Sequence, residues 1–93
     1  MDTFTSENST TLEEEKFIEV YEDVLVLENY YQIKYGLPSV YKNALENSCK
    51  KIFEKHKIKK QDFEKSFDYY AHRPEQLKSI NQQIIARLNK KKL

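Results

Sequence analysis

Apolar side chains recur at alternating three- and four-residue steps along most of the chain, which is the period of an α-helix with one buried face. The first such stripe falls at Phe17, Val20, Tyr21, Val24, Leu27 and Tyr31. The chain has only one Gly and two Pro in 93 residues, whereas an all-β fold needs many turns rich in both. The sequence therefore predicts an all-α fold.

Local signals divide the pattern into a small domain of four helices. Thr11 and Glu14 have the spacing of a capping box at the start of the first helix, and Gly36 can take the left-handed conformation that ends it. A turn is expected near residues 57–60, where the stripe of the second helix reaches polar positions. Pro74 suits a first helical turn, where its missing N–H costs nothing. We expect helices at about residues 11–35, 39–56, 60–72 and 74–90.

Each later helix has its own predicted inner face. The second helix is expected to pack through Tyr41, Leu45, Ser48 or Cys49, Ile52 and Phe53. The third is expected to pack through Phe63, Ser66, Phe67 and Tyr70, and the fourth through Leu77, Ile80, Ile84 and Leu88. In the first helix Ile18, Leu25, Val26, Tyr30 and Ile33 lie off the stripe. Its second half is therefore apolar nearly all round, which indicates a central helix or an exposed patch that binds something.

The remaining segments are polar. Residues 1–10 have no apolar period and are predicted to form a disordered leader or tether. A chain of this length suffices for one domain, expected over residues 11–93. It contains no run of about 18 apolar residues, the length needed to cross a bilayer.

The net charge of +1 conceals a division along the chain. Residues 1–35 carry nine of the fifteen acidic side chains, and residues 36–93 carry fourteen of the sixteen basic ones. One interpretation is attraction inside the fold between an acidic first helix and a basic remainder. The other is a basic patch for nucleic acid or anionic lipid. We favour the first, because no aromatic residues interleave the lysines.

Few residues in the chain are suited to catalysis. Cys49 and His56 are seven residues apart, so they share a helix face but are separated by about 10 Å of rise. That distance is too long for a nucleophile and its base, and Cys49 is expected to be a small core residue. Known catalytic and metal-binding motifs are not found. We therefore expect no enzymatic activity, no metal, no cofactor and no small-molecule substrate.

One segment carries a recognisable family pattern, in which an aromatic-rich helix precedes K-x-G-I-T-x-x-x-F, S-x-x-Y-Y and P-E-x-L. The matching residues are Tyr41, Ile52, Lys55, Ile58, Phe63, Ser66, Tyr69, Tyr70, Pro74, Glu75 and Leu77. Over about residues 12–90 the chain resembles the domain of unknown function 4296, which recurs in short predicted lipoproteins of Bacteroidetes. The chain departs from the pattern at Lys57, where the family has Gly, and at Lys59, where it has Thr.

The resemblance implies a location and a fold but no chemistry, since the family has no established activity. It implies that a signal peptide and a lipobox cysteine precede residue 1 in the native protein. The domain would then lie at the cell envelope on a lipid anchor, with the leader as its tether. Without such a segment, the chain would be cytoplasmic.

The number of tyrosines suggests a binding surface, because seven are more than a small core needs. The candidate partner-binding residues are Tyr30, Tyr35, Tyr41, Tyr69, His72 and Arg73. We expect a non-enzymatic protein-interaction or assembly module with an unidentified protein partner. Two alternatives stay open: a cytoplasmic nucleic-acid-binding or regulatory module built on Lys50 to Lys60, and a homodimer formed through the first helix. Acidic side chains on the third helix oppose the nucleic-acid alternative, since they repel a phosphate backbone.

Overall fold

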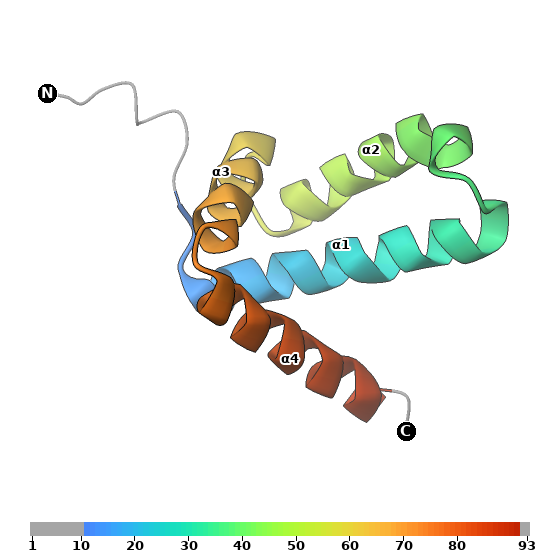
Figure 1. The fold of residues 1–93 in the computed structure, drawn as a ribbon. Coiled ribbons are helices and arrows are strands. Elements are labelled where there is room, and N and C mark those ends of the chain that lie inside the picture. Colours follow the sequence, from blue (N-terminus) through green and yellow to red (C-terminus); the bar gives the residue numbers. More distant parts are fainter. Residues whose placement is uncertain (1–10, 92–93) are drawn as a thin grey trace, which may run out of the picture.

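The computed structural model describes residues 11–91, which fold into four α-helices (Figure 1). They are α1 (Glu14–Tyr35), α2 (Pro38–Lys55), α3 (Lys60–Ala71) and α4 (Pro74–Lys91). No strand occurs between residues 11 and 91, so the predicted all-α fold of four helices is confirmed. The predicted disordered leader, residues 1–10, lies outside the described residues. Within the described range, no helix combines the length and the hydropathy needed to span a bilayer.

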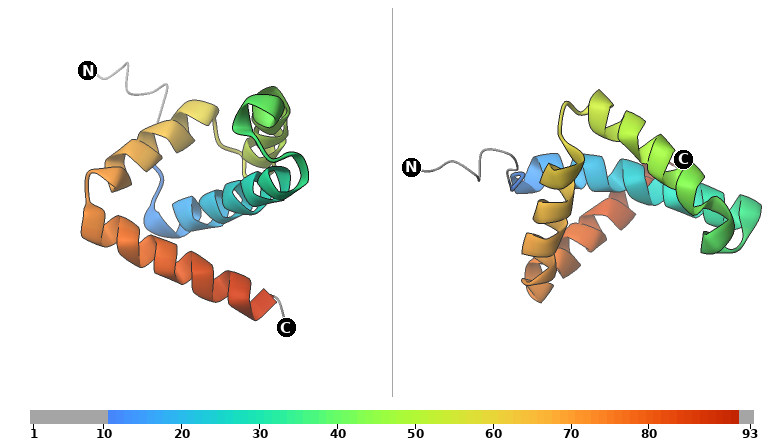
Figure 2. Two further views of the ribbon diagram at one scale, coloured as in Figure 1. Left: turned by 45° about the vertical axis from the view of Figure 1, so that its right-hand side comes forward. Right: turned by 90° about the horizontal axis from the view of Figure 1, so that it is seen from above.

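The longest helix, α1, contacts all three of the others. The second helix runs back alongside it, α3 crosses its first half, and α4 leaves that end on the other side and diverges (Figures 1 and 2). The far half of α1 is therefore accompanied by α2 but not by α3 or α4. This α1–α2 hairpin projects from the body of the domain and makes the molecule elongated, with extents of 47 × 29 × 23 Å.

The core lies where the first half of α1 meets α3 and α4. It consists of Phe17, Ile18, Tyr70, Ile80 and Ile84. The ring of Phe17 packs against that of Tyr70, with centroids 4.7 Å apart, and against that of Phe63 at 5.6 Å. The predicted inner faces of α2 and α4 are confirmed: Tyr41 and Phe53 are buried on one, and Ile80 and Ile84 on the other.

Phe67 was predicted to be part of the core, and that prediction is wrong. Its side chain is exposed, and it meets Tyr21 edge-on with ring centroids 5.7 Å apart. Phe63, Ser66 and Tyr70 occupy the side of α3 that faces α1. Phe67 lies one residue after Ser66, about 100° further round the helix, and so falls at the edge of that contact.

The loop between α2 and α3 contains the two departures from the family pattern, Lys57 and Lys59. Lys57 has a φ of 60°, a left-handed conformation that glycine adopts without a Cβ penalty. The turn therefore forms at the predicted place, although its lysine is less suited to it than the family's glycine. In place of a threonine cap on α3, the Asp62 carboxylate accepts a 3.0 Å hydrogen bond from the backbone N–H of Lys59.

The first helix ends as predicted but begins differently. Gly36 has a φ of 87°, and the Leu37 N–H donates to the Tyr35 carbonyl at 3.1 Å, which closes a tight three-residue turn. The predicted capping box between Thr11 and Glu14 is absent. Helix α1 starts at Glu14, and Glu13 precedes it without a side-chain cap.

Candidate functional site

The segment before α1 is held by α3. The buried hydroxyl of Ser66 donates to the Asp62 carbonyl at 2.6 Å and accepts the Leu12 N–H at 2.7 Å. The hydroxyl of Tyr70 donates to the Leu12 carbonyl at 2.8 Å. Burial raises the pKa of Tyr70, so the phenol keeps the proton that it donates. Ser66 and Tyr70 therefore anchor the start of the domain, and the Ser66 hydroxyl is fully engaged in structural bonds.

A buried carboxylate joins α1 to α4. Glu22 is 2% exposed, and one of its oxygens accepts a 2.7 Å hydrogen bond from Nε of Arg87. Its other oxygen accepts a hydrogen bond from Nζ of Lys91. Burial alone would raise the pKa of Glu22, but the hydrogen bonds and positive charges of Lys91 and Arg87 lower it. Glu22 is therefore a charged group whose acceptors are both occupied.

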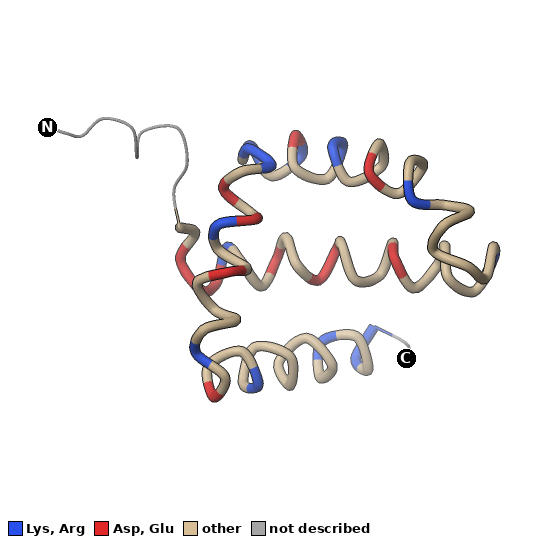
Figure 3. The backbone as a smooth tube through the Cα atoms, turned by 45° about the horizontal axis from the view of Figure 1, so that its top comes forward, with Lys and Arg blue, Asp and Glu red and all other residues tan. Residues whose placement is uncertain are grey.

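The next residue joins α1 to α2. Oδ2 of Asp23 lies 2.7 Å from Nε2 of His56 and 3.4 Å from Nζ of Lys55. Burial opposes ionisation of Asp23, yet these two partners lower the pKa of the carboxyl. Figure 3 shows the acidic residues of α1 lying between two helices that carry Lys and Arg. These contacts bear out the interpretation that the division of charge produces attraction inside the fold.

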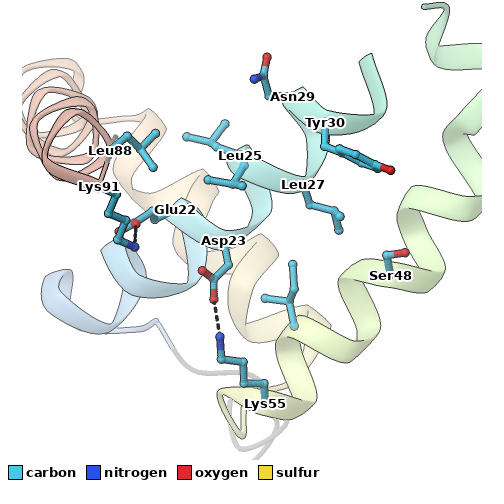
Figure 4. A pocket seen from close by; sticks show the side chains of 12 residues that line it. Glu22, Asp23, Leu25, Leu27, Asn29, Tyr30, Ser48, Lys55, Leu88 and Lys91 are labelled. Carbon is cyan, nitrogen blue, oxygen red and sulfur yellow. Dashed lines mark hydrogen bonds and ion pairs between the residues drawn. The ribbon is translucent and has the colours of Figure 1, made fainter. Parts of the chain in front are cut away.

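A groove with a volume of about 1000 Å³ lies over the middle of α1 (Figure 4). Helix α1 forms its floor, α2 one side and the last turn of α4 the other. Its apolar lining comes from Leu25, Val26, Leu27, Ile52 and Leu88. Glu22 and Asp23 lie at one end, where Lys91 lies beside Glu22 and Lys55 beside Asp23. Because both carboxylates are already paired, the groove offers a partner apolar surface and lysine N–H donors.

The floor of the groove continues outward as an exposed apolar strip, which we define as Val26, Tyr30 and Ile33. These residues follow each other at steps of four and three, so they share one face of α1. Tyr30 is 52% exposed and Ile33 is 77% exposed. At the end of the hairpin, Leu37 and Val40 are exposed as well. The projecting hairpin therefore presents large apolar side chains that the rest of the domain does not cover.

Three of the six predicted partner-binding residues lie on this hairpin, and two of them are accessible. Tyr30 belongs to the apolar strip, and its hydroxyl accepts a 3.2 Å hydrogen bond from Lys34. Tyr35 is partly exposed near the turn. Tyr41 is only 4% exposed, and its ring stacks on Tyr31 with centroids 5.8 Å apart. The proposal of Tyr41 as a surface residue therefore requires correction, because it packs between α1 and α2.

The other three predicted residues form a separate group where α3 meets α4. The guanidinium of Arg73 lies 3.7 Å from the ring centroid of Tyr69 and donates a 3.0 Å hydrogen bond to the Tyr69 carbonyl. Nδ1 of His72 bonds to the Asp68 carbonyl at 2.8 Å. These contacts close the end of α3. This corner lies at the opposite end of the molecule from the tip of the hairpin (Figure 1), so the six residues do not form one surface.

Two kinds of reactive site that His, Cys, Asp and Glu side chains can form are a metal centre and an activated thiol. Across residues 11–91 no three His, Cys, Asp or Glu side chains are grouped so that they could hold a metal ion. Burial, with the charges of Glu28 and Glu46, raises the pKa of the Cys49 thiol. Cys49 is therefore a neutral thiol near physiological pH rather than an activated nucleophile.

Sequence reasoning missed the groove itself. Glu22 and Lys91, which line one end of it, are polar residues that no local pattern distinguishes. One signal did point to the region: the second half of the first helix is apolar nearly all round, and Val26 and Ile33 lie off its main stripe. The residues off the stripe are those left for the exposed face.

Comparison with known proteins identifies a family. A family model described as Domain of unknown function (DUF4296) matches residues 9–93, which confirms the resemblance expected over about residues 12–90. No curated protein and no solved structure matches the chain.

Proposed function

The chain belongs to the domain of unknown function 4296 family, and we propose that it is a non-enzymatic protein-interaction module that binds its partner through the projecting α1–α2 hairpin. The observation that carries this proposal is the apolar strip of Val26, Tyr30 and Ile33. These side chains are about half to three-quarters exposed, and they adjoin an apolar groove. Large contiguous apolar surfaces of this kind are typical of interaction sites.

The residues of the strip are well suited to a protein interface. Tyrosine buries a large ring at little cost in side-chain entropy and still offers a hydroxyl. Ile33 extends apolar contact beyond it. The lysines beside the groove supply a polar rim, and interfaces commonly combine an apolar centre with such a rim.

We further propose that the module works at the cell envelope as part of a lipoprotein. The support for this part is the resemblance to predicted lipoproteins. The coding sequence upstream of Met1 tests it. A hydrophobic segment that ends in a lipobox cysteine would support the envelope proposal, and a translation start at Met1 would contradict it.

Site-specific photo-crosslinking tests the interaction itself. A photoreactive phenylalanine derivative at Ile33 should give a discrete crosslinked adduct in the native cell, because that position is 77% exposed and belongs to the proposed contact. The same derivative at Gln82, an exposed residue of α4, is the matched control and should not give that adduct. A second control combines the Ile33 probe with Tyr30→Ala, which should weaken the adduct.

The crosslinking results distinguish a partner bound at the hairpin from a homodimer and from the absence of a contact there. An adduct from Ile33 that Tyr30→Ala weakens and Tyr69→Ala leaves unchanged assigns the contact to the hairpin. Identical adducts from Ile33 and Gln82, or none from Ile33, would show that the hairpin is not an interaction surface. An adduct of twice the chain's own mass would assign the contact to a homodimer instead.

A further inference from the structure

We infer that the groove takes an amphipathic helix of a partner protein, in which acidic side chains flank an apolar ridge. This inference rests on the proposed function, because it names the partner's chemistry at the same site. The argument comes from the charges at the edges of the groove and from its shape.

The edges of the groove carry hydrogen-bond donors. Lys55 on α2 and Lys91 on α4 line it from opposite sides. Their side chains are mostly exposed, and each bonds to one carboxylate of α1. A lysine ammonium has three N–H donors, so each of these lysines can donate to a further acidic partner. Glu22 and Asp23 already have partners and do not compete strongly for another cation.

Lys51 extends the basic edge along α2. It lies one helical turn before Lys55, so the two side chains are neighbours on the same side of the helix. Lys51 is exposed, and among residues 11–91 it has no ion-pair partner. An acidic side chain on a bound segment would meet it without displacing an existing contact.

The shape of the groove favours a helix over a lipid chain. Val26 and Tyr30 line the groove and are still about half exposed, so the groove is open along one side. An acyl chain is apolar all round and needs enclosure on most of its surface. An amphipathic helix buries one stripe and leaves its polar face in water. The floor of the groove runs along α1 from Glu22 to Tyr30. These eight steps extend over roughly 12 Å, the length of about two helical turns.

A second copy of the chain fits these edges less well. Around Tyr30, its apolar strip is bordered on α1 by Asn29 and Lys34. The carboxylates one turn before Val26, Glu22 and Asp23, are already paired within the fold. Pairing two strips would therefore bring an amide and a lysine, not carboxylates, toward Lys51 and Lys55. Charge complementarity favours a different helix with acidic flanks.

The test uses two synthetic helical peptides of roughly 18 residues, long enough to form a measurable helix population. Both carry the same leucine stripe, and one has Glu and the other Lys at the flanking positions. Fluorescence anisotropy with the purified chain should show that the Glu peptide binds about ten-fold or more tightly than the Lys peptide, since several exposed charge pairs change sign. Added salt should reduce the difference in affinity between the two peptides, because it screens exposed charges.

Charge reversal at one edge provides the specific test. Lys51→Glu should weaken binding of the Glu peptide and strengthen binding of the Lys peptide. Lys50→Glu is the matched control, because it makes the same change in net charge on the neighbouring residue, about 100° further round the helix. It should alter the preference much less. Circular dichroism checks that both variants keep their helices.

Several results would overturn the inference. Equal binding of the two peptides, or equal effects of Lys50→Glu and Lys51→Glu, would remove the role of the edge lysines. Stoichiometric binding of fluorescent dodecanoate without peptide binding would assign the groove to a lipid. A dimer in light scattering that Ile33→Asp abolishes would assign it to a second copy. An Ile33 crosslink in cells without peptide binding would leave the proposed function intact and remove this inference alone.

Discussion

The hydroxyl of Tyr70 donates a 2.8 Å hydrogen bond to the backbone carbonyl of Leu12, 58 positions earlier in the chain. The hydroxyl of Ser66, one turn before Tyr70, accepts a 2.7 Å hydrogen bond from the backbone N–H of Leu12. Helix α3 thus holds both backbone polar groups of Leu12 and determines where the chain enters the domain. Two polar residues of the S-x-x-Y-Y pattern have a structural explanation, and the pattern does not require a catalytic one.

We predict that Tyr70→Phe destabilises the domain by about 1–2 kcal/mol, because the Leu12 carbonyl loses its donor in a buried setting. Tyr69→Phe removes the same hydroxyl from the neighbouring, partly exposed residue and should change stability by less than about 0.5 kcal/mol. Urea denaturation of both variants measures the difference. Equal losses would show that the Leu12 contact contributes nothing specific.

The paired carboxylate of Glu22 should make the domain less stable in acid. Its ordinary pKa of 4.5 is lowered in the folded protein: burial opposes the shift, but Lys91 and Arg87 outweigh it. Since the folded state binds the proton less tightly than the unfolded state, the stabilisation is present above about pH 4.5 and is lost as the pH falls below it. Glu22→Gln should lower the unfolding free energy by about 2 kcal/mol at pH 7 through the loss of two charged hydrogen bonds.

Measuring the free energy of unfolding of wild type and Glu22→Gln at several pH values isolates the contribution of the Glu22 charge. The difference in unfolding free energy between wild type and Glu22→Gln should shrink as the pH falls from 7 toward 3, because the wild-type carboxylate becomes protonated and loses its charge. Glu19→Gln removes the same charge one turn earlier on α1 and is the control. A difference that stays constant with pH would show that Glu22 contributes through packing rather than through its charge.

The helices could be predicted from the sequence because each amphipathic stripe is a local property. Gly36 and Pro74 mark boundaries, and the burial of Ile80 and Ile84 follows from spacing alone. The groove could not be predicted in the same way. It depends on the angle between α2 and α4, which long-range packing decides.

Glu22 illustrates the same limit. It stands among many acidic residues of the first helix, and no local pattern distinguishes it from its neighbours. Its partners Arg87 and Lys91 come 65 and 69 positions later. Tyr41 shows the converse: the stripe placed it on an inner face, whereas the surplus of tyrosines suggested a surface. The structure agrees with the stripe, because the ring of Tyr31 covers it.

Neighbouring isoleucines on α4 test the helical period directly. Ile84 is 1% exposed and Ile85 is 57% exposed. Ile84→Ala should therefore lower the free energy of unfolding by about 2–5 kcal/mol through lost burial and the cavity left in the core. In so small a domain, that loss approaches the whole stability. Ile85→Ala should change stability by no more than about 0.5 kcal/mol. Thermal and urea unfolding measure both, and comparable losses would contradict the assigned face of α4.

The tyrosines of the hairpin should separate stability from binding. Tyr30→Ala removes a ring from the exposed apolar strip, so the free energy of unfolding should change by no more than about 1 kcal/mol. Tyr41→Ala removes a buried ring from the contact between α1 and α2 and should cost about 3 kcal/mol or more. Denaturation measures the stabilities, and the Ile33 crosslink measures binding on the folded variants.

Denaturation and the Ile33 crosslink together decide whether the exposed apolar strip binds a partner. Tyr30→Ala should reduce the Ile33 crosslink while the domain stays folded, because the missing ring is contact area and not support for the fold. Tyr69→Ala, at the far corner, should leave that crosslink unchanged. If Tyr30→Ala unfolds the domain, Tyr30 is a structural residue and the strip loses its strongest contact. If the variant is stable and the crosslink persists undiminished, the partner binds elsewhere on the hairpin.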